Sequence, residues 1–325
     1  MQGMSEPASQ STVAFTDVEP PLRALLDRIV AAGRPPIHAL SPAKAREMMR
    51  KSTPILEAAA PDLPIVRDIR LAGADGLLKA RIYDVKGGPN RPTLVYFHGG
   101  GFVIGDLDTH DALCRRLAAV GRFRVIAVDY RLAPEHPFPA AHEDAAAVLE
   151  DIVARSWELR VDPERLAVGG DSAGGAIAAV LARACAQGEA PPIRFQLLIY
   201  PVVMHEGVTA SRQRLTEGWG LDAADMEWFA NCTFAAGGDR REPRASPLLH
   251  PVPEGLAPAL VITAGFDPLT DEGARYAERL NNAGVACAHW HFGDQIHGFV
   301  SMTAVSTRAI EVIEGCAGYV QNAIL

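Results

Sequence analysis

The stretch Leu166-Ala167-Val168-Gly169-Gly170-Asp171-Ser172-Ala173-Gly174 joins an apolar run to a pentapeptide in which glycines flank a serine. The small-residue segment 175–183 that follows is typical of a helix. Because Gly170 and Gly174 lack a Cβ atom, a strand and a helix can approach closely and the serine can adopt a strained backbone conformation. Such a turn exposes the hydroxyl at the positive end of a helix. The stretch therefore predicts that Ser172 is a nucleophile, with an ordinary glycine-rich turn as the alternative.

A second glycine-rich segment, His98-Gly99-Gly100-Gly101-Phe102, ends the apolar run 92–97, which has the pattern of a buried strand. Consecutive glycines leave backbone N–H groups uncovered, as an oxyanion hole requires. Phosphate binding is the competing use of such a loop, but the chain contains neither a P-loop pattern nor Gly-x-Gly-x-x-Gly after a strand. We expect His98 to fix the loop by hydrogen bonds rather than to act as a base.

Two further candidates follow apolar runs nearer the carboxyl terminus. Asp267 follows the run 259–266, at the kind of strand end where open α/β sheets place their active sites. Asp271 and Glu272 are nearby rivals, and Asp271 is better suited to capping the helix that follows. His297 lies in a loop beyond the last apolar run, from which it can fold back over the serine.

Ser172, Asp267 and His297 occur in the chain order of the triad of α/β-hydrolases. A serine hydroxyl is a weak nucleophile until a base removes its proton, and a neutral imidazole suits this role because its pKa lies near the working pH. The carboxylate holds the imidazole in the correct tautomer and stabilises the imidazolium that forms. The order therefore predicts a serine hydrolase in which these three residues are catalytic.

Further motifs surround these residues: Gly105-Asp106-Leu107-Asp108, Tyr130-Arg131-Leu132-Ala133-Pro134-Glu135, Asp267-Pro268-Leu269 with Asp271-Glu272-Gly273, and His297-Gly298-Phe299. With them the chain resembles, from about Thr93 to Phe299, the hormone-sensitive-lipase-like carboxylesterases, also called bacterial family IV esterases. The Gly-Asp-Ser-Ala-Gly form of the pentapeptide is similar to that of the larger subgroup of this family. Thr270 and Ile296 stand where many members have other residues, and neither is one of the catalytic groups.

The resemblance implies an α/β-hydrolase fold, an α/β structure whose mostly parallel sheet is flanked by helices and covered by a helical cap. It implies oxyanion donors at the backbone N–H groups of Gly99, Gly100, Gly101 and Ala173. It also implies hydrolysis of carboxylic esters through an acyl-enzyme on Ser172, with no cofactor. The same triad would permit hydrolysis of lactones, carbamates or amides. Plant gibberellin receptors resemble this family but have lost the catalytic histidine, whereas His297 is present here, so a receptor role is the disfavoured alternative.

Alternating strand-like and helical segments over residues 60–201 predict the first part of the α/β core, and residues 241–325 form its expected second part. We expect residues 1–59 to form an N-terminal segment with cap helices and residues 202–240 to form a cap insertion. Aromatic and neighbouring apolar side chains define the candidate substrate pocket, although such residues also pack in cores: Phe102, Trp219, Trp228, Phe229 and Ile296.

Composition limits the partners of the chain. Its 325 residues are 48% hydrophobic and carry a net charge of −8, which disfavours a nucleic-acid partner. No apolar run approaches the roughly 18–20 residues of a membrane span, so we expect a soluble enzyme. Because the chain lacks an evident interfacial surface, we expect it to act on short- to medium-chain esters rather than on long-chain fats. Five cysteines without paired spacing, and no leader pattern at the start, predict a cytoplasmic protein with reduced thiols.

The last strand-like segment, 286–292, carries two further features. His289 and His291 alternate along it and share one face, but no third ligand accompanies them, so we expect surface histidines and no metal site. As the last strand of the predicted sheet, the segment is also the candidate edge for a homodimer.

Overall fold

The computed structural model describes residues 17–325, and the predictions for residues 1–16 lie outside this range. Within it, eight strands form one sheet in the order β1-β2-β4-β3-β5-β6-β7-β8. The strands are β1 (Ile65–Gly73), β2 (Gly76–Asp84), β3 (Arg91–Phe97), β4 (Arg124–Asp129), β5 (Val161–Asp171), β6 (Phe195–Ile199), β7 (Ala259–Phe266) and β8 (Cys287–Ile296). β2 pairs antiparallel with both β1 and β4, whereas the remaining neighbours pair in parallel. The predicted α/β class with a mostly parallel sheet is confirmed.

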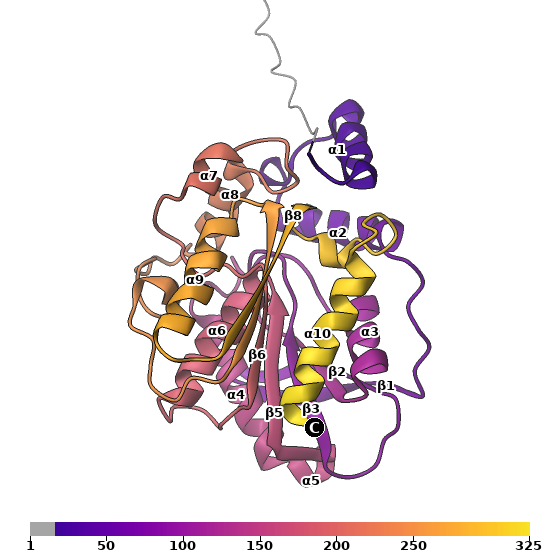
Figure 1. The fold of residues 1–325 in the computed structure, drawn as a ribbon, viewed down its shortest axis with the longest axis vertical. Helices are drawn as coiled ribbons and strands as arrows, with labels where there is room; N and C mark the ends of the chain where they lie inside the picture. The colour runs from indigo at the N-terminus through magenta and orange to yellow at the C-terminus, as the bar shows by residue number, and fades with distance from the viewer. Residues whose placement is uncertain (1–16) are drawn as a thin grey trace, which may run out of the picture.

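Helices cover both faces of this sheet (Figure 1). The α-helices described are α1 (Pro20–Ala32), α2 (Pro42–Leu56), α3 (Asp111–Gly121), α4 (Ala140–Ala154), α5 (Ser156–Leu159), α6 (Ala173–Ala186), α7 (Ala210–Arg214), α8 (Ala223–Thr233), α9 (Thr270–Asn282) and α10 (Ala309–Ile324). Apolar side chains of α4, α6 and α9 form a core cluster on one face, and those of α3 and α10 form a second cluster on the other.

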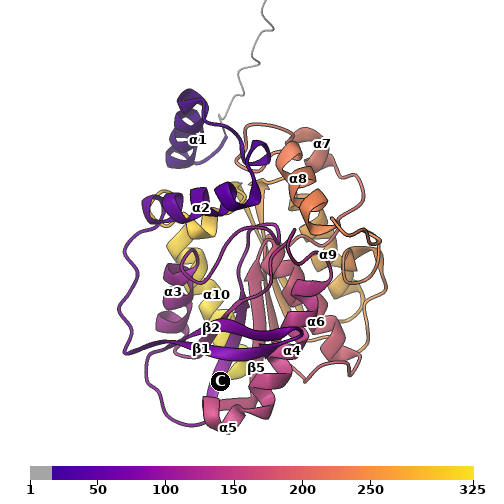
Figure 2. The same ribbon diagram turned by 180° about the vertical axis from the view of Figure 1, so that it is seen from behind.

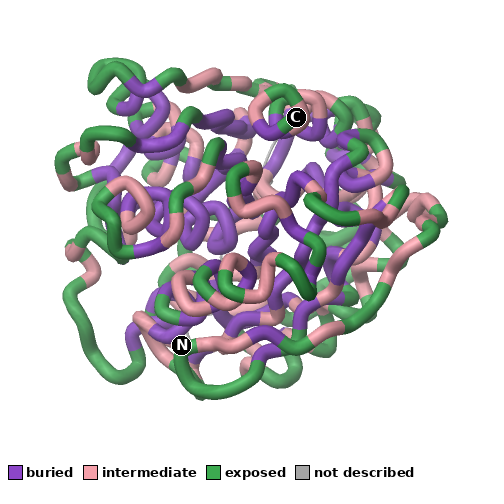
Figure 3. Tube along the Cα trace, turned by 90° about the horizontal axis from the view of Figure 1, so that it is seen from below, coloured by how far each residue is buried: buried purple, intermediate pink, exposed green. Residues whose placement is uncertain are grey.

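The central strands are apolar throughout because helices bury both of their faces. Every residue of β6 is buried, as is every residue of β3 after Arg91. The helix after β5 also packs closely against the sheet, since a Cβ atom at Gly174 would overlap the carbonyl of Phe97. Figure 3 shows the resulting buried interior surrounded by exposed loops and outer helix faces.

Two segments far apart in the sequence meet at one end of the molecule. α1 and α2 lie there together with α7 and α8, beyond the arrowhead end of β8 (Figures 1 and 2). His38, in a short 3₁₀ helix between α1 and α2, connects the N-terminal segment directly to α8. Its backbone N–H and its Nδ1 atom lie 3.2 and 2.7 Å from Asp225 Oδ1 in α8. These are the segments in which the sequence predicts a cap.

Two further observations bear on partners. β8 is an edge strand of the sheet, and its side chains alternate between exposed and half-buried over most of its length. The homodimer contact at 286–292 remains a prediction. None of the helices in residues 17–325 combines the length and the apolar character that crossing a bilayer requires.

Candidate active site

Ser172 lies at the sharp turn between β5 and α6. Its backbone has φ 53° and ψ −117°, a conformation that is strained for a residue with a side chain. Its N–H donates to the carbonyl of Ile199 at 2.8 Å, which ties the turn to β6. A Cβ atom at Gly170 would overlap the carbonyl of Gly174, so the flanking glycines are needed for this close turn.

The structure brings the predicted nucleophile, base and acid together from three strand ends. Ser172 Oγ lies 3.0 Å from His297 Nε2, and His297 Nδ1 lies 2.7 Å from Asp267 Oδ2. Ser172 follows β5, Asp267 follows β7 and His297 follows β8, and parallel strands end at the same edge of a sheet. Asp267 is fully buried, and its second oxygen accepts the N–H of Leu269 at 2.8 Å.

The electrostatics of His297 reflect this arrangement. Burial lowers the pKa of His297, but the charge of Asp267 and the hydrogen bond to its carboxylate raise it, and the result lies above the ordinary 6.5. The carboxylate therefore stabilises the imidazolium, which is the state that a base reaches after taking a proton.

Asp271 and Glu272, the two alternatives to Asp267 as the acid, bind other partners. Glu272 is fully buried and bound to Arg212, with 2.5 Å between its Oε2 atom and Arg212 Nη2. Asp271 does not cap α9 as expected, because the helix begins one residue earlier, at Thr270. Its carboxylate instead accepts the N–H of Ser211 at 2.8 Å.

The glycine-rich loop after β3 lies beside this turn. Gly100 and Gly101 have φ values of 116° and 57°, in the region that favours glycine. The Gly99 N–H is already engaged, since it donates to Asp171 Oδ1 at 3.0 Å. No hydrogen bond described for residues 17–325 uses the N–H groups of Gly100, Gly101 or Ala173. Three of the four expected donors are therefore free to bind a ligand.

Asp171 is a buried residue of the site whose role the sequence reasoning missed. Its carboxylate accepts hydrogen bonds from Tyr96 Oη at 2.8 Å and from the Gly99 N–H at 3.0 Å, and it lies 3.4 Å from His110 Nε2. Burial raises the pKa of Asp171, but the charge of His110 and these hydrogen bonds hold it below its ordinary range. Asp171 thus joins the serine turn to the glycine loop. An acid inside the pentapeptide was the available signal, but its sequence position does not show where the carboxylate points.

His98 holds the same loop from its other side. Its Nδ1 atom lies 2.7 Å from the carbonyl of Gly99, and its ring stacks on Tyr130 with 4.3 Å between centroids. The Tyr130 hydroxyl donates to the His98 carbonyl at 2.7 Å. Burial and the neighbouring charge of His110 lower the pKa of His98 to about 4. A neutral ring fixed in this way agrees with the structural role expected for it.

The five candidate pocket residues do not form one cluster. Phe229 of α8 lies directly over the glycine loop, because a Cβ atom at Gly101 would overlap its ring, and Trp228 packs edge-on against Phe229 with 5.1 Å between centroids. The side chains of Phe102 and Ile296 are instead buried in the core clusters on opposite faces of the sheet, at 3% and 1% exposure. The fifth, Trp219, stacks on the ring of Phe266 at 4.8 Å. Of the five, Phe229 therefore lies against the glycine loop and Trp228 packs on Phe229, and the substrate pocket stays a prediction.

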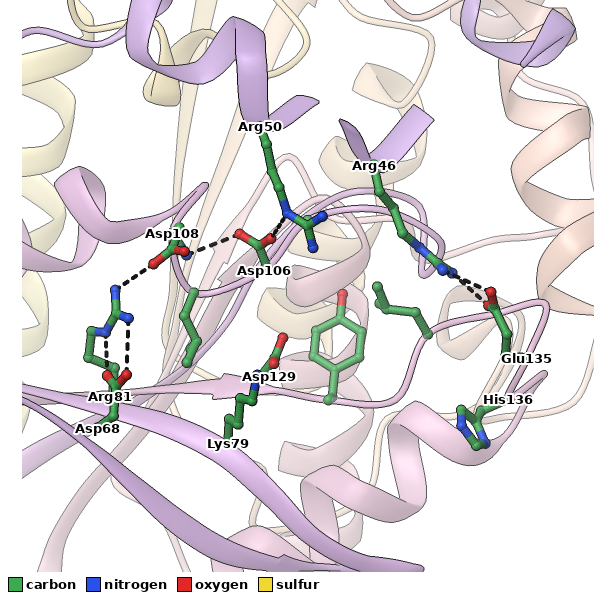
Figure 4. A pocket seen from close by; sticks show the side chains of 14 residues that line it. Arg46, Arg50, Asp68, Lys79, Arg81, Asp106, Asp108, Asp129, Glu135 and His136 are labelled. Atoms are coloured by element: carbon green, nitrogen blue, oxygen red, sulfur yellow. Dashed lines mark hydrogen bonds and ion pairs between the residues drawn. The ribbon is translucent and has the colours of Figure 1, made fainter. Parts of the chain in front are cut away.

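A separate cavity of about 630 Å³ lies between α2, the segment 105–108 and the strands β1, β2 and β4. None of the triad candidates lines it. Ion pairs cross its walls (Figure 4) and include Arg46–Glu135 at 2.6 Å, Arg50–Asp106 at 2.5 Å and Arg81–Asp68 at 2.6 Å. Because its charged groups largely neutralise one another, this cavity differs from the apolar pocket that an acyl chain requires.

The two histidines of β8 lie close together. His289 Nε2 and His291 Nδ1 lie 2.8 and 3.0 Å from the hydroxyl of Thr263, so both rings share one face of the strand, as predicted. No group of three or more side chains in the described part of the chain, 17–325, is arranged to hold a metal ion.

Comparison with known proteins agrees with this geometry. Residues 94–301, more than half of the chain, match the family model described as alpha/beta hydrolase fold. The chain is 39% identical over 311 residues to the ethyl acetate hydrolase of Pseudomonas putida, with 90% of this chain and 95% of that protein covered. It is 45% identical over 243 residues to the carboxylic ester hydrolase LipN of Mycobacterium tuberculosis, with 73% of this chain and 65% of LipN covered.

A solved structure is similar over nearly the whole chain. Ester-hydrolase EH1AB1 from the metagenome of Lake Arreo is 41% identical, has a TM-score of 0.90, and is covered over 98% of its length by 94% of this chain. The fold, the arrangement at the strand ends and these similarities lead to one assignment: the chain belongs to the hormone-sensitive-lipase-like, or bacterial family IV, branch of the α/β-hydrolase superfamily, and is a carboxylic ester hydrolase.

Proposed function

We propose that Ser172, His297 and Asp267 form the catalytic triad of this esterase and that Ser172 carries the acyl group. The observation that supports this most strongly is the pair of contacts, 3.0 and 2.7 Å, that links the three side chains at a strained turn. If His297 Nδ1 carries a hydrogen and donates a hydrogen bond to Asp267, Nε2 has a lone pair directed at the serine hydroxyl. Nε2 can then accept the Ser172 proton while Oγ attacks the ester carbonyl.

The negative oxygen of the tetrahedral intermediate is bound by backbone N–H groups in this proposal. We assign the donors to Gly100, Gly101 and Ala173, the last of which stands at the first residue of α6. Gly99 is omitted from the earlier set of four because its N–H donates to Asp171. His297 then protonates the leaving alcohol, and the same residue activates the water that releases the acid from Ser172.

The substrates we propose are short- to medium-chain carboxylic esters. Phe229 covers the glycine loop, and α1, α2, α7 and α8 gather at the end of the sheet where the triad lies, so a cap formed by residues 17–59 and 202–240 would limit the acyl group (Figure 2). A relative that is 39% identical is named for the hydrolysis of ethyl acetate, a short ester. The Gly-Asp-Ser-Ala-Gly pentapeptide supports placement in the larger subgroup of the family.

Initial rates on nitrophenyl esters from acetyl to palmitoyl test this proposal, with Ser172→Ala as the blank. We expect turnover that peaks at short to medium acyl chains and falls by roughly 10⁴ or more in the variant. Turnover that survives the substitution would contradict the proposed nucleophile. Turnover of lactones or amides in preference to every ester would favour the alternative substrates of the same triad.

A further inference from the structure

α7 packs against α9, the helix that follows the loop carrying the proposed catalytic acid (Figure 1). Ser211, the second residue of α7, is fully buried, and its hydroxyl donates to the carbonyl of Pro268 at 2.7 Å. Its backbone N–H donates to Asp271 Oδ2 at 2.8 Å, and the N–H of Asp271 donates back to the hydroxyl at 3.3 Å. Three hydrogen bonds therefore tie one serine to the residues that directly follow Asp267.

The next residue of α7 adds an ion pair to this contact. Arg212 Nε and Nη2 lie 2.9 and 2.5 Å from Glu272 Oε2, and Nη2 also donates to the carbonyl of Met204. The other oxygen of Glu272 accepts the backbone N–H groups of Val203 and Met204 at 3.0 and 3.2 Å. The chain after β6, α7 and the first turn of α9 are thus joined through one buried carboxylate.

A buried ion pair is weak evidence for a contribution to stability, because removing two charges from water costs free energy that their attraction only partly returns. Its position suggests another role. The pair lies next to the segment Asp267–Thr270, in which one Asp267 oxygen is fixed by the Leu269 N–H and the other contacts His297. Displacements of about 1 Å in a catalytic arrangement can reduce rates by about 10².

We propose that Ser211 and Arg212 are positioning residues for the triad: α7 holds the loop 267–272 and so sets the carboxylate of Asp267 against His297. This inference rests on the proposed catalytic role of Asp267. In this proposal the insertion between β6 and β7 has a second role besides covering the site, because movement of α7 would loosen the contact between Asp267 and His297.

Kinetics of Ser211→Ala and Arg212→Lys in the full chain test the proposal. We expect kcat on nitrophenyl butyrate to fall about tenfold to hundredfold, with KM changed much less, because neither residue belongs to the proposed triad or to the proposed oxyanion donors. The charge and hydrogen bond of Asp267 raise the pKa of His297, so the acid limb of kcat/KM should move to lower pH in both variants. Gln213→Ala, an exposed position on the same helix, should change neither quantity.

A double variant separates positioning from stability. Arg212→Gln with Glu272→Gln removes both buried charges together, so it should fold at least as well as Arg212→Gln alone while its kcat stays low. Unchanged kcat and an unchanged acid limb in folded Ser211→Ala would overturn the proposal, as would a loss of melting temperature alone. Ser172→Ala is assayed in parallel. If it retains ester turnover, the triad assignment itself fails and this inference fails with it, whereas an inactive Ser172→Ala beside an unaffected Ser211→Ala rejects only the role of α7.

Discussion

In the proposed triad, the imidazole of His297 has to be neutral to accept the proton of Ser172, so its pKa would set the acid limb of activity. Burial lowers this pKa, but the charge of Asp267 and the hydrogen bond to it raise the pKa above 6.5. Activity is therefore expected above the pKa of His297 and is lost as the pH falls through it. The pH profile of kcat/KM on nitrophenyl acetate measures this limb directly.

Asp267→Asn is the matched variant for this pH profile. Without the negative charge the acid limb should move to lower pH, while kcat falls by roughly 10⁴ because the amide no longer holds the imidazole in the productive tautomer. An acid limb that stays in place in this variant would show that another group titrates.

Asp171 gives a second prediction for a single residue. Asp171→Asn removes the negative charge that strengthens the hydrogen bonds from the Gly99 N–H and the Tyr96 hydroxyl, and it replaces one of the two acceptor oxygens by a donor, so the glycine loop should be held less firmly beside Ser172. Loss of one oxyanion donor lowers kcat by about 10²–10³, and a displaced loop is expected to lower it by about 10 to 10². Tyr96→Phe removes only the hydroxyl and should lower kcat less. Equal kcat values in wild type and Asp171→Asn would contradict this role.

Among the elements, the parallel strands were the easiest to predict. Strands buried on both faces read as continuous apolar runs, and these runs located β3, β6 and β7. The run 166–168 marked only the middle of β5, which extends over Val161–Asp171, because its first half contains Asp162 and Glu164 at half-buried or exposed positions. The α/β order could therefore be predicted, but strand ends could not.

The triad candidates could be predicted because each follows an apolar run, whereas side-chain directions could not. Phe102 follows three glycines and has φ 64°, and its side chain is 3% exposed in a core cluster, a burial that the local sequence does not indicate. Ser211 and Arg212 contact the segment 267–272 across about 60 residues of sequence, and local sequence patterns do not predict such long-range contacts.

The position of α8 over the glycine loop leads to a prediction about specificity. Phe229→Ala removes the ring that lies over Gly101, so the ratio of kcat/KM for octanoyl to acetyl esters should rise several-fold as space opens beside the loop. Phe234→Ala is the control, since Phe234 packs on Phe138 with 5.0 Å between centroids. It should lower stability and leave the ratio unchanged. A ratio that changes equally in both variants would favour a general loosening of α8.

At the scale of the whole molecule, a buried ion cluster ties the antiparallel side of the sheet to the parallel side. Asp84 at the end of β2 is fully buried and bound to Arg124 Nη2 at 2.7 Å and to Arg91 Nη2 at 3.0 Å. Burial raises the pKa of Asp84, but the hydrogen bonds from Arg91, Lys86 and Arg124 hold it below its ordinary range. Because the folded-state pKa is lowered, this stabilisation is present above the unfolded pKa of about 3.9 and is lost as the pH falls through the folded value.

Asp84→Asn should therefore lower the free energy of unfolding at pH 7 by about 3–5 kcal/mol, because it leaves the guanidinium of Arg124 buried and uncompensated. Urea unfolding followed by circular dichroism measures the loss. Asp68→Asn is the control, since its carboxylate is 63% exposed and its pair with Arg81 should contribute only about 0–1 kcal/mol. Equal losses in the two variants would mean that the buried cluster contributes no more to the free energy of unfolding than the exposed pair does.

The triad candidates and the helices expected to form the cap lie at the same end of the molecule. Strands β5, β7 and β8 each deliver one triad candidate to that edge of the sheet, and the helices before β1 and between β6 and β7 gather over the same end (Figures 1 and 2). α7 connects these helices to the sheet edge, because it contacts the loop that carries Asp267. The site is therefore an assembly of distant segments, and its integrity should depend on the fold as a unit.

The most direct measurement is mass spectrometry of the protein after reaction with a nitrophenyl phosphonate, which leaves a stable adduct on a serine that attacks it. One adduct per chain is expected on the peptide that contains Ser172, with none in Ser172→Ala and much slower labelling in His297→Ala. An adduct on a different residue, or continued ester hydrolysis by a chain that is not labelled at Ser172, would contradict the assignment of the nucleophile.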